Sequence, residues 1–210
     1  MSEQSDAIFA RIARRYDLIN KLLSAGRDQS WRHSAIRHLP PGRLLDLGSG
    51  TGVAAPVFGD RDVVALDPVR EMLALSPIRH RVAAVGEALP FPNESFDSVF
   101  SAFVFRNLSS IDQTLVEMHR VMRSGGVAAV VDLGRPRHGI ARSISRLGTA
   151  ITLPLAGLIA RAPADYWYLH QSLDKLPQPE ELFAQSPLRL GLVWRMGLFG
   201  FVYGALLHKD

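Results

Sequence analysis

The sequence predicts an α/β fold with a mostly parallel sheet, and the pattern of apolar residues carries this prediction. Short apolar segments without clean polar alternation recur between positions 44 and 131, separated by helical or glycine-rich segments. Strands of this kind are buried on both faces, as in parallel sheets that carry helices on each side. The chain has 210 residues, which suits one domain and is short for two domains of ordinary size.

The individual elements follow from spacing and from chain-breaking residues. Apolar residues at helical spacing predict helices over 9–23 and 31–38, before a break at Pro40-Pro41-Gly42. The sequence then predicts strands over 44–47, 63–66, 82–85, 96–103 and 127–131, with helices over 69–75 and 111–122. Helical, arginine-dotted sequence interrupts this alternation over 137–186, and two closing antiparallel strands are expected over 188–194 and 201–207.

These elements assemble into one predicted domain, 1–210, with a seven-stranded Rossmann-like sheet and helices on both faces. Within it we expect an N-terminal helical cap (1–40), a cofactor-binding core (43–133) and a helical substrate-side insertion (137–186) before the last two strands.

The composition excludes several kinds of chemistry. The chain contains no cysteine, so disulfides, thiolate zinc sites and cysteine nucleophiles are excluded, and its seven histidines show no metal-ligand spacing, so no metal is expected. A net charge of +4 fits a nucleic-acid or membrane-surface partner without requiring either. The polar first residues lack a signal-peptide core, and the apolar stretch 147–160 is shorter than the ~18–20 residues that span a bilayer. We therefore expect a soluble cytoplasmic protein that can touch a membrane from one side.

The most informative motif is Asp46-Leu47-Gly48-Ser49-Gly50-Thr51-Gly52, which follows a predicted strand and precedes a predicted helix. Glycines in such a loop permit unusual backbone angles and let a ligand approach the main chain closely. Val53 occupies the last position of the dinucleotide fingerprint G-x-G-x-x-G/A, so the match to NAD enzymes is poor. The alternative is an ordinary glycine turn beside a surface aspartate.

The spacing acidic-x-Gly-x-Gly-x-Gly resembles motif I of class I S-adenosylmethionine methyltransferases. The resemblance implies that Asp46 accepts from the ligand's ammonium, that Asp67 at the end of the second strand takes both ribose hydroxyls, and that Met72 lies near the adenine. The full set of cofactor-binding residues that it implies is Asp46, Gly48, Gly50, Thr51, Asp67, Pro68, Met72, Gly86, Glu87, Ser101 and Ala102.

Further segments narrow the class. The opening Tyr16-Asp17-Leu18-Ile19-Asn20, the pair Arg106-Asn107 after the fourth strand, and the segments 87–97, 117–126 and 165–169 resemble the ubiquinone/menaquinone biosynthesis C-methyltransferases, the UbiE/MenG family. The resemblance covers roughly residues 8–185. It departs from the family pattern at Val85-Gly86, where members usually carry Asp or Asn and then Ala, at Ala102, and at Trp167, and these departures leave room for a different acceptor.

The resemblance implies methyl transfer to a ring carbon of a polyprenylated quinol. Arg106 would then stabilise the phenolate and Asn107 would orient the ring or a water; the alternative is that Arg106 ties its loop to a nearby carboxylate. His170 is a candidate general base, although most isolated histidines are structural or exposed. Tyr16 and Tyr166 are candidate acceptor contacts. Members of the family also suggest a homodimer.

The arginines that precede the apolar stretch 151–159 suggest a membrane contact. A basic run leading into apolar sequence can rest on an anionic membrane surface, and the alternative is a solvated helix face whose other side packs on the sheet. The run consists of Arg135, Arg137, His138, Arg142 and Arg146.

Three rival functions remain open at this point. The first is methylation of another small aromatic or lipid acceptor, and the second is a non-catalytic subunit that binds S-adenosylmethionine. The third is a nucleic-acid methyltransferase. The sequence argues against it, because the chain has Ser101-Ala102-Phe103-Val104-Phe105 where enzymes that methylate base amino groups carry an Asn/Asp-Pro-Pro-aromatic motif. No nucleic-acid partner is therefore expected.

Overall fold

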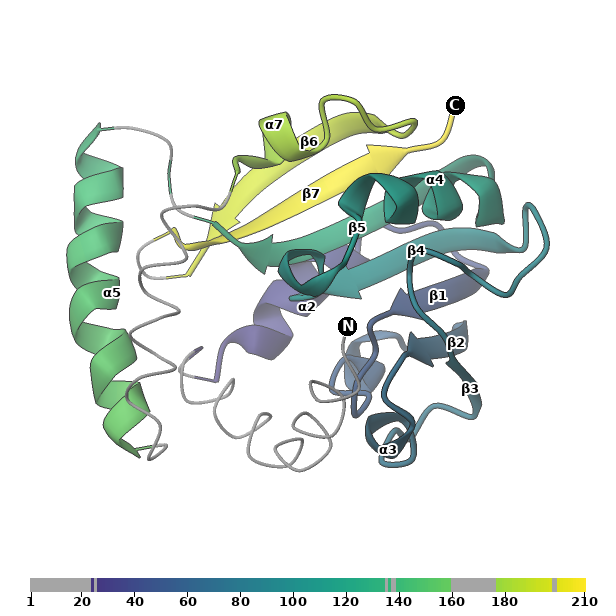
Figure 1. Ribbon diagram of the computed structural model, residues 1–210, viewed down its shortest axis with the longest axis horizontal. Coiled ribbons are helices and arrows are strands. Elements are labelled where there is room, and N and C mark those ends of the chain that lie inside the picture. The colour runs from purple at the N-terminus through teal and green to yellow at the C-terminus, as the bar shows by residue number, and fades with distance from the viewer. Residues whose placement is uncertain (1–23, 25, 135, 137–138, 160–176, 198–199) are drawn as a thin grey trace.

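The computed structural model describes residues 24, 26–134, 136, 139–159, 177–197 and 200–210. Within them, seven strands form one sheet in the order β3-β2-β1-β4-β5-β7-β6 (Figure 1). The strands β1 (Arg43–Leu47), β2 (Asp62–Asp67), β3 (His80–Ala83), β4 (Phe96–Ala102) and β5 (Met122–Leu133) pair in parallel. The last strand, β7 (Val202–His208), pairs antiparallel with β5 and with β6 (Arg189–Met196). The predicted fold class, including the two closing strands, is confirmed.

Helices cover both faces of this sheet because neighbouring strand residues point to opposite sides. On one face, Trp31, Ala35 and Ile36 of α2 (Asp28–Ile36) pack in the same buried cluster as Leu44 of β1. On the other face, α4 (Ile111–Val121) buries Leu115, Met118 and Val121 in a second cluster, which contains Leu45.

The remaining elements are shorter or lie outside this core. They are α3 (Arg70–Leu73), α5 (Gly139–Ile159), α7 (Pro179–Leu182) and the 3₁₀ turns η1 (Ala55–Val57) and η2 (Phe105–Asn107). The insertion before the last two strands therefore contains α5 and α7. No helix among the described residues is long and apolar enough to cross a membrane.

Several element bounds differ from the sequence prediction, among them those of the third strand, the glycine loop and the helix after the fourth strand. The third strand is His80–Ala83 instead of 82–85, because this edge strand is set by its backbone pairing with β2 and three of its four residues are exposed. The glycine loop leads into the short turn η1 instead of a full helix. The predicted helix over 111–122 ends at Val121, and Met122 pairs with Phe96 as the first residue of β5.

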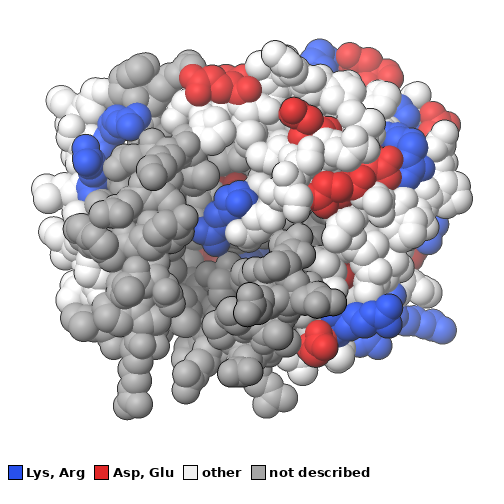
Figure 2. Space-filling view, in the orientation of Figure 1, with Lys and Arg blue, Asp and Glu red and all other residues white. Residues whose placement is uncertain are grey.

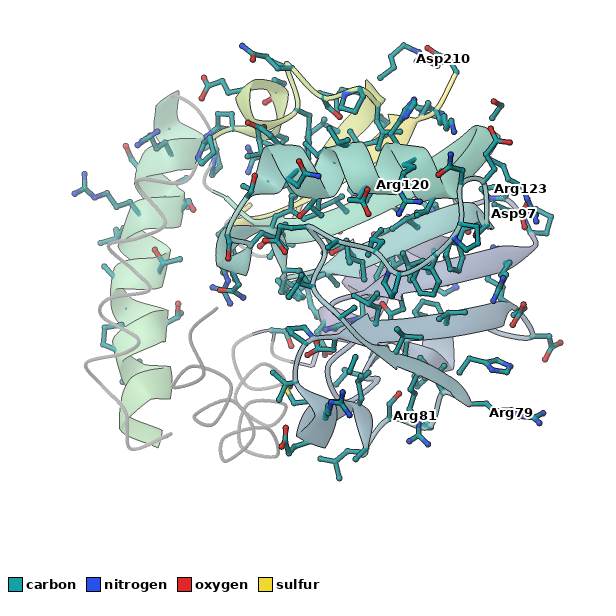
Figure 3. The ribbon with its side chains drawn as sticks, turned by 45° about the vertical axis from the view of Figure 1, so that its right-hand side comes forward. Arg79, Arg81, Asp97, Arg120, Arg123 and Asp210 are labelled. Atoms are coloured by element: carbon teal, nitrogen blue, oxygen red, sulfur yellow. The ribbon has the colours of Figure 1, made fainter. Side chains whose placement is uncertain are left out.

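The amino end of β4 is fixed by a polar cluster far from the loop after β1. The carboxylate of Asp97 accepts from the backbone N–H of Arg43 at 2.7 Å and from the Arg123 guanidinium at 2.5 Å. Figure 3 shows Asp97 and Arg123 side by side at this end of the sheet. The loops that form the site lie at the opposite end of the sheet, where the parallel strands terminate.

Candidate active site

A pocket lies at the carboxyl ends of the parallel strands, where doubly wound sheets bind ligands. The loops after β1, β2, β3 and β4 all contribute to it, and Arg32 of α2 joins them. Its lining is Arg32, Asp46, Leu47, Gly48, Ser49, Gly50, Thr51, Val53, Ala54, Leu66, Asp67, Pro68, Val69, Met72, Val85, Gly86, Glu87, Phe100, Ala102, Phe103, Val104, Asn107, Leu108 and Ser109.

The glycine-rich loop after β1 turns sharply at the floor of the pocket. The backbone N–H groups of Gly48 and Ser49 both donate to the carbonyl of Leu66, at 2.8 and 2.9 Å, so the loop is anchored to β2. Gly48 has a φ of 72°, and a Cβ there would collide with the side chain of Val104. The loop therefore needs glycine at this position both for its backbone angle and for its contact with the loop after β4.

Asp67, the last residue of β2, holds the far side of this loop. Its Oδ2 accepts from the backbone N–H of Gly50 at 2.9 Å and its Oδ1 accepts from that of Val69 at 2.9 Å. A carboxylate has about four lone-pair positions, so each oxygen retains capacity to accept a ligand hydroxyl. The buried side chain is thereby held in place at the pocket wall.

Asp46 is a second acidic residue of the pocket, and it is only 2% exposed. Burial raises the pKa of its carboxyl to about 7 and the nearby charge of Asp67 adds to this, whereas the Ser49 side chain and the Arg32 charge oppose it. Within the described residues its Oδ2 has no hydrogen-bond partner. A buried acceptor without a partner is costly, so this oxygen is suited to a cationic or hydrogen-bonding ligand.

The loop after β3 forms another part of the pocket wall. Val85 is 41% exposed and lines the pocket beside Gly86. The Glu87 carboxylate accepts from the backbone N–H groups of Ser109 and Ser110, at 2.7 and 3.2 Å. The Glu87 side chain therefore ties the loop after β3 to the segment before α4. The Val85 side chain and the backbone groups of Gly86 remain to contact a ligand.

This loop is further held by an ion pair on α4. Glu117 and Arg120 are 2.8 Å apart, and Glu117 accepts from the backbone N–H of Leu89 at 2.8 Å. Arg120 donates to the carbonyls of Leu89 and Phe91, at 2.9 and 2.7 Å. The segments 87–97 and 117–126, which the sequence singled out, thus contact each other and shape the pocket from outside.

The structure brings together most of the residues that the sequence predicted for cofactor binding. Ten of the eleven line the pocket, and Asn107 lines it too. Ser101 is the exception, because it is fully buried and its hydroxyl donates to the carbonyl of Leu47 at 3.1 Å. The ten are Asp46, Gly48, Gly50, Thr51, Asp67, Pro68, Met72, Gly86, Glu87 and Ala102.

The remaining predicted residues lie elsewhere. Arg106 is not part of the pocket lining, and its charge acts on the buried carboxyl of Asp132 at the end of β5. Asp132 accepts from the backbone N–H of Phe105 at 2.9 Å, which holds η2 in place. This arrangement fits the alternative in which Arg106 ties its loop to a carboxylate. Tyr16, Tyr166 and His170 lie outside the described residues.

Sequence reasoning missed the pocket residue Arg32, which contacts Phe103. The guanidinium of Arg32 lies 5.3 Å from the centre of the Phe103 ring and pairs with Asp28 at 2.7 Å. Asp28 and Arg32 are spaced i,i+4, which is a detectable signal for a helical ion pair. Phe103 is one of several aromatic residues that the sequence leaves open as pocket or core residues. It has a φ of 63°, which is rare for a bulky residue and often associated with functional sites, and no sequence feature indicates this backbone angle.

The strand order, the glycine loop and the two acidic strand ends together define the class I methyltransferase fold. Solved structures agree. A SAM-dependent methyltransferase from Thermotoga maritima, described as a possible histamine N-methyltransferase, has a TM-score of 0.68 at 16% identity and covers 97% of this chain and 99% of its own. A putative S-adenosyl-L-methionine-dependent methyltransferase from Methanococcus maripaludis has a TM-score of 0.67 at 16% identity, with 96% and 93% covered.

The chain belongs to the ubiE/COQ5 methyltransferase family, whose sequence model matches residues 1–186. It is 35% identical over 200 residues to the ubiquinone/menaquinone biosynthesis C-methyltransferase UbiE of Geotalea uraniireducens, covering 87% of this chain and 85% of that protein. It is 37% identical over 195 residues to the demethylmenaquinone methyltransferase of Thermus thermophilus, covering 84% and 88%. The predicted family is confirmed, and with it a methyltransferase whose methyl donor is S-adenosylmethionine.

Proposed function

We propose that this chain transfers a methyl group from S-adenosylmethionine to a ring carbon of a polyprenylated quinol of the demethylmenaquinol or demethoxyubiquinol type. Its relatives carry the names ubiquinone/menaquinone biosynthesis C-methyltransferase and demethylmenaquinone methyltransferase. The observation that carries the proposal is the buried carboxyl of Asp46, which presents an oxygen without a described partner beside the glycine loop.

The residues of the pocket fit the donor. When bound, S-adenosylmethionine supplies a methyl group on a positively charged sulfur. Asp46 would accept from its ammonium group and Asp67 from its ribose hydroxyls, which is the same use of a strand-end acid as in dinucleotide sites. The donor has no phosphate, so the loop around Gly48 has to provide close packing instead of an anion cradle. Val85 and the backbone of Gly86 would face the adenine.

The protein's main catalytic contribution is then alignment of the acceptor. A phenol ring carbon becomes nucleophilic when a neighbouring hydroxyl loses its proton. That carbon would form the new bond to the methyl carbon as the sulfur–methyl bond breaks and S-adenosylhomocysteine leaves, and loss of the proton on the same ring carbon to a base would then restore the aromatic ring. Asn107, which lines the pocket, would orient the ring or a water. Arg106 would stabilise the phenolate by its charge. Tyr16 and Tyr166 would contact the acceptor, and His170 would accept a proton.

The proposal extends to partners and location. A polyprenylated acceptor resides in a membrane, so we propose peripheral contact between the protein and a bilayer. A homodimer, a cytoplasmic location, a single domain over 1–210 and the absence of a nucleic-acid partner stay predictions, which sedimentation and cell fractionation can test.

The decisive experiment is incubation of the purified chain with methyl-labelled S-adenosylmethionine and a demethylmenaquinol or demethoxyubiquinol in detergent. Mass spectrometry of the product should place the label on a ring carbon. A panel of other phenols and lipids runs in parallel, and Asp67→Ala serves as the inactive control. If the label appears only on another acceptor, then that acceptor, and not the quinol, is the substrate. Calorimetric binding of the donor without transfer to any acceptor would favour the non-catalytic subunit, and no binding would overturn the proposal.

A further inference from the structure

The long helix of the insertion presents an apolar stripe to the outside. Five large apolar side chains of α5 are between 51% and 79% exposed. At ~100° per residue they fall within an arc of about 80° on the helix surface. They are Ile140, Ile144, Leu147, Ile151 and Leu155, and we call them the α5 stripe.

The polar side of the same helix is turned inward. Ser145 and Thr149 are at most 1% exposed and lie about 120° to 160° around the helix from the stripe. The Thr149 hydroxyl donates to the carbonyl of Ser145 at 2.9 Å, and that of Thr152 donates to the carbonyl of Gly148 at 2.9 Å. The hydroxyls of Thr149 and Thr152 are therefore satisfied within the helix, whereas the buried Ser145 hydroxyl has no hydrogen-bond partner among the described residues. An ordinary surface helix buries its apolar side, whereas the described side chains of α5 show the inverse arrangement.

The charge around the stripe is of one sign. Between residues 133 and 164 the sequence contains no aspartate or glutamate and five arginines. Figure 1 shows α5 on the side toward which β4 and β5 point. In Figure 2 the described surface on that side is blue and white, whereas most acidic residues in view lie toward α7 and α4 and at the lower edge. This charge complements anionic headgroups. Arg142 and Arg146 lie about 140° to 180° around the helix from the centre of the stripe, which is the side on which an interfacial helix carries its basic residues.

The dimensions fit a helix that lies on a bilayer. The stripe runs from Ile140 to Leu155, a span of 16 residues, so its ends lie about 22 Å apart at ~1.5 Å per step. Arg142 and Arg146 lie within the first half of α5, and the helix does not meet the criterion for a membrane span. A helix with an apolar stripe, basic residues and too little apolar length to cross lies in the interface between headgroups and acyl chains.

We propose that α5 is the membrane-docking element, with the α5 stripe inserted among the acyl chains of an anionic bilayer and its arginines at the headgroups. This rests on the proposed function, since a polyprenylated acceptor is dissolved in that bilayer. The parallel strands point toward α5, and the pocket lies at their ends, so docking on this side presents the pocket to the membrane that holds the acceptor.

Flotation of the full chain with vesicles tests the proposal. The vesicles contain phosphatidylcholine alone or mixed with phosphatidylglycerol. The wild-type chain should float with the anionic vesicles at low salt, and salt should weaken the association. The variant Ile144→Ser/Leu147→Ser/Ile151→Ser should lose about tenfold or more in vesicle partitioning. Its matched control is Leu75→Ser/Val116→Ser/Leu192→Ser, which changes three side chains of 44–51% exposure on other elements and should float like the wild type.

Two further measurements separate this inference from the proposed function. Donor affinity by calorimetry and methylation of a short-tailed, water-soluble quinol should be the same in the stripe variant and the wild type, whereas methylation of a long-tailed quinol in vesicles should fall about tenfold or more. Flotation of the wild type without methylation of any quinol would overturn the function and leave the docking element in place.

Other outcomes overturn the docking element itself. The proposal fails if the wild type does not float at low salt, or if the stripe variant floats as well as the wild type. A change from dimer to monomer in the stripe variant, seen by sedimentation with flotation unaltered, would make the stripe a self-association surface instead.

Discussion

The carboxylate of Asp67 accepts a hydrogen bond from the backbone N–H of Gly50 at 2.9 Å, so the end of the second strand fixes the glycine loop that follows the first. The same carboxylate accepts from the backbone N–H of Val69. Recognition of the ribose and the shape of the loop are therefore coupled through one side chain. A residue that binds a ligand and also orders its own site should be sensitive to small changes.

We expect Asp67→Ala to weaken binding of S-adenosylmethionine by about a hundredfold or more. The loss of one charged hydrogen bond is worth roughly 1.5–3 kcal/mol, and this variant removes the acceptor for Gly50 as well as for the ligand. Asp67→Asn keeps one carbonyl oxygen and should bind between the two. Calorimetry measures the affinities, and an Asp67→Ala chain that binds like the wild type would exclude the ribose role.

The glycines of the loop should differ in their tolerance of a side chain. Gly48 and Gly50 both have positive φ, but a Cβ at Gly48 would collide with Val104, whereas at Gly50 it would lie 3.2 Å from the Met72 methyl. We expect Gly48→Ala to lower the free energy of unfolding by about 2–4 kcal/mol and Gly50→Ala by about 1 kcal/mol. Urea unfolding of both variants tests this, and equal losses would contradict the packing of Val104 on the loop.

The buried carboxyl of Asp46 should make stability depend on pH. Its pKa is about 7 in the folded chain, against 3.8 for an ordinary aspartate, so the folded state binds more protons between these values. Stability contributed by this group therefore falls as the pH rises from about 4 to about 7 and stays level above. We expect Asp46→Asn to be more stable than the wild type at pH 8, by roughly 2–4 kcal/mol, and similar near pH 4. Thermal unfolding of both proteins across this pH range measures the difference. If Asp46→Asn is no more stable than the wild type at pH 8, the pKa of Asp46 is not raised.

Binding of the donor should show the opposite trend with pH. The ionised form of Asp46 attracts a cationic ligand, so the affinity for S-adenosylmethionine should rise as the pH passes through about 7. Calorimetry in two buffers of different ionisation enthalpy should detect proton release near pH 7. In Asp46→Asn the affinity should be low and nearly independent of pH over this range. Proton release that persists in this variant would assign the titration to another group.

Variants of Arg106 distinguish a catalytic role of this residue from a structural one. If it stabilises a phenolate, Arg106→Ala should bind the donor within about twofold of the wild type and lose about a hundredfold in turnover. If it only offsets the charge of Asp132, the variant should lose stability and keep its turnover. Turnover and urea unfolding measured on the same preparations distinguish the two, with Arg106→Lys as the charge-retaining control.

Local patterns were sufficient to predict much of this fold. The apolar segments of β1, β2 and β4 are buried on both faces, so their sequences carry the signal of a parallel sheet without knowledge of their neighbours. The edge strand β3 was misplaced by two residues, since His80 and Arg81 pair through their backbones and their side chains give no apolar signal. Pairing partners decide an exposed edge, and they lie far away in the sequence.

The candidate site divides in the same way. The sequence by itself determined the glycine loop, the acids that end β1 and β2, and the family, because glycine spacing and acidic strand ends are local features that this chemistry requires. Tertiary structure alone decided that Asp46 is buried with an oxygen lacking a described partner, that Arg106 acts on Asp132, and that α5 turns its apolar side outward. Burial and charge contacts depend on which segments meet in space, and a linear pattern does not contain that information.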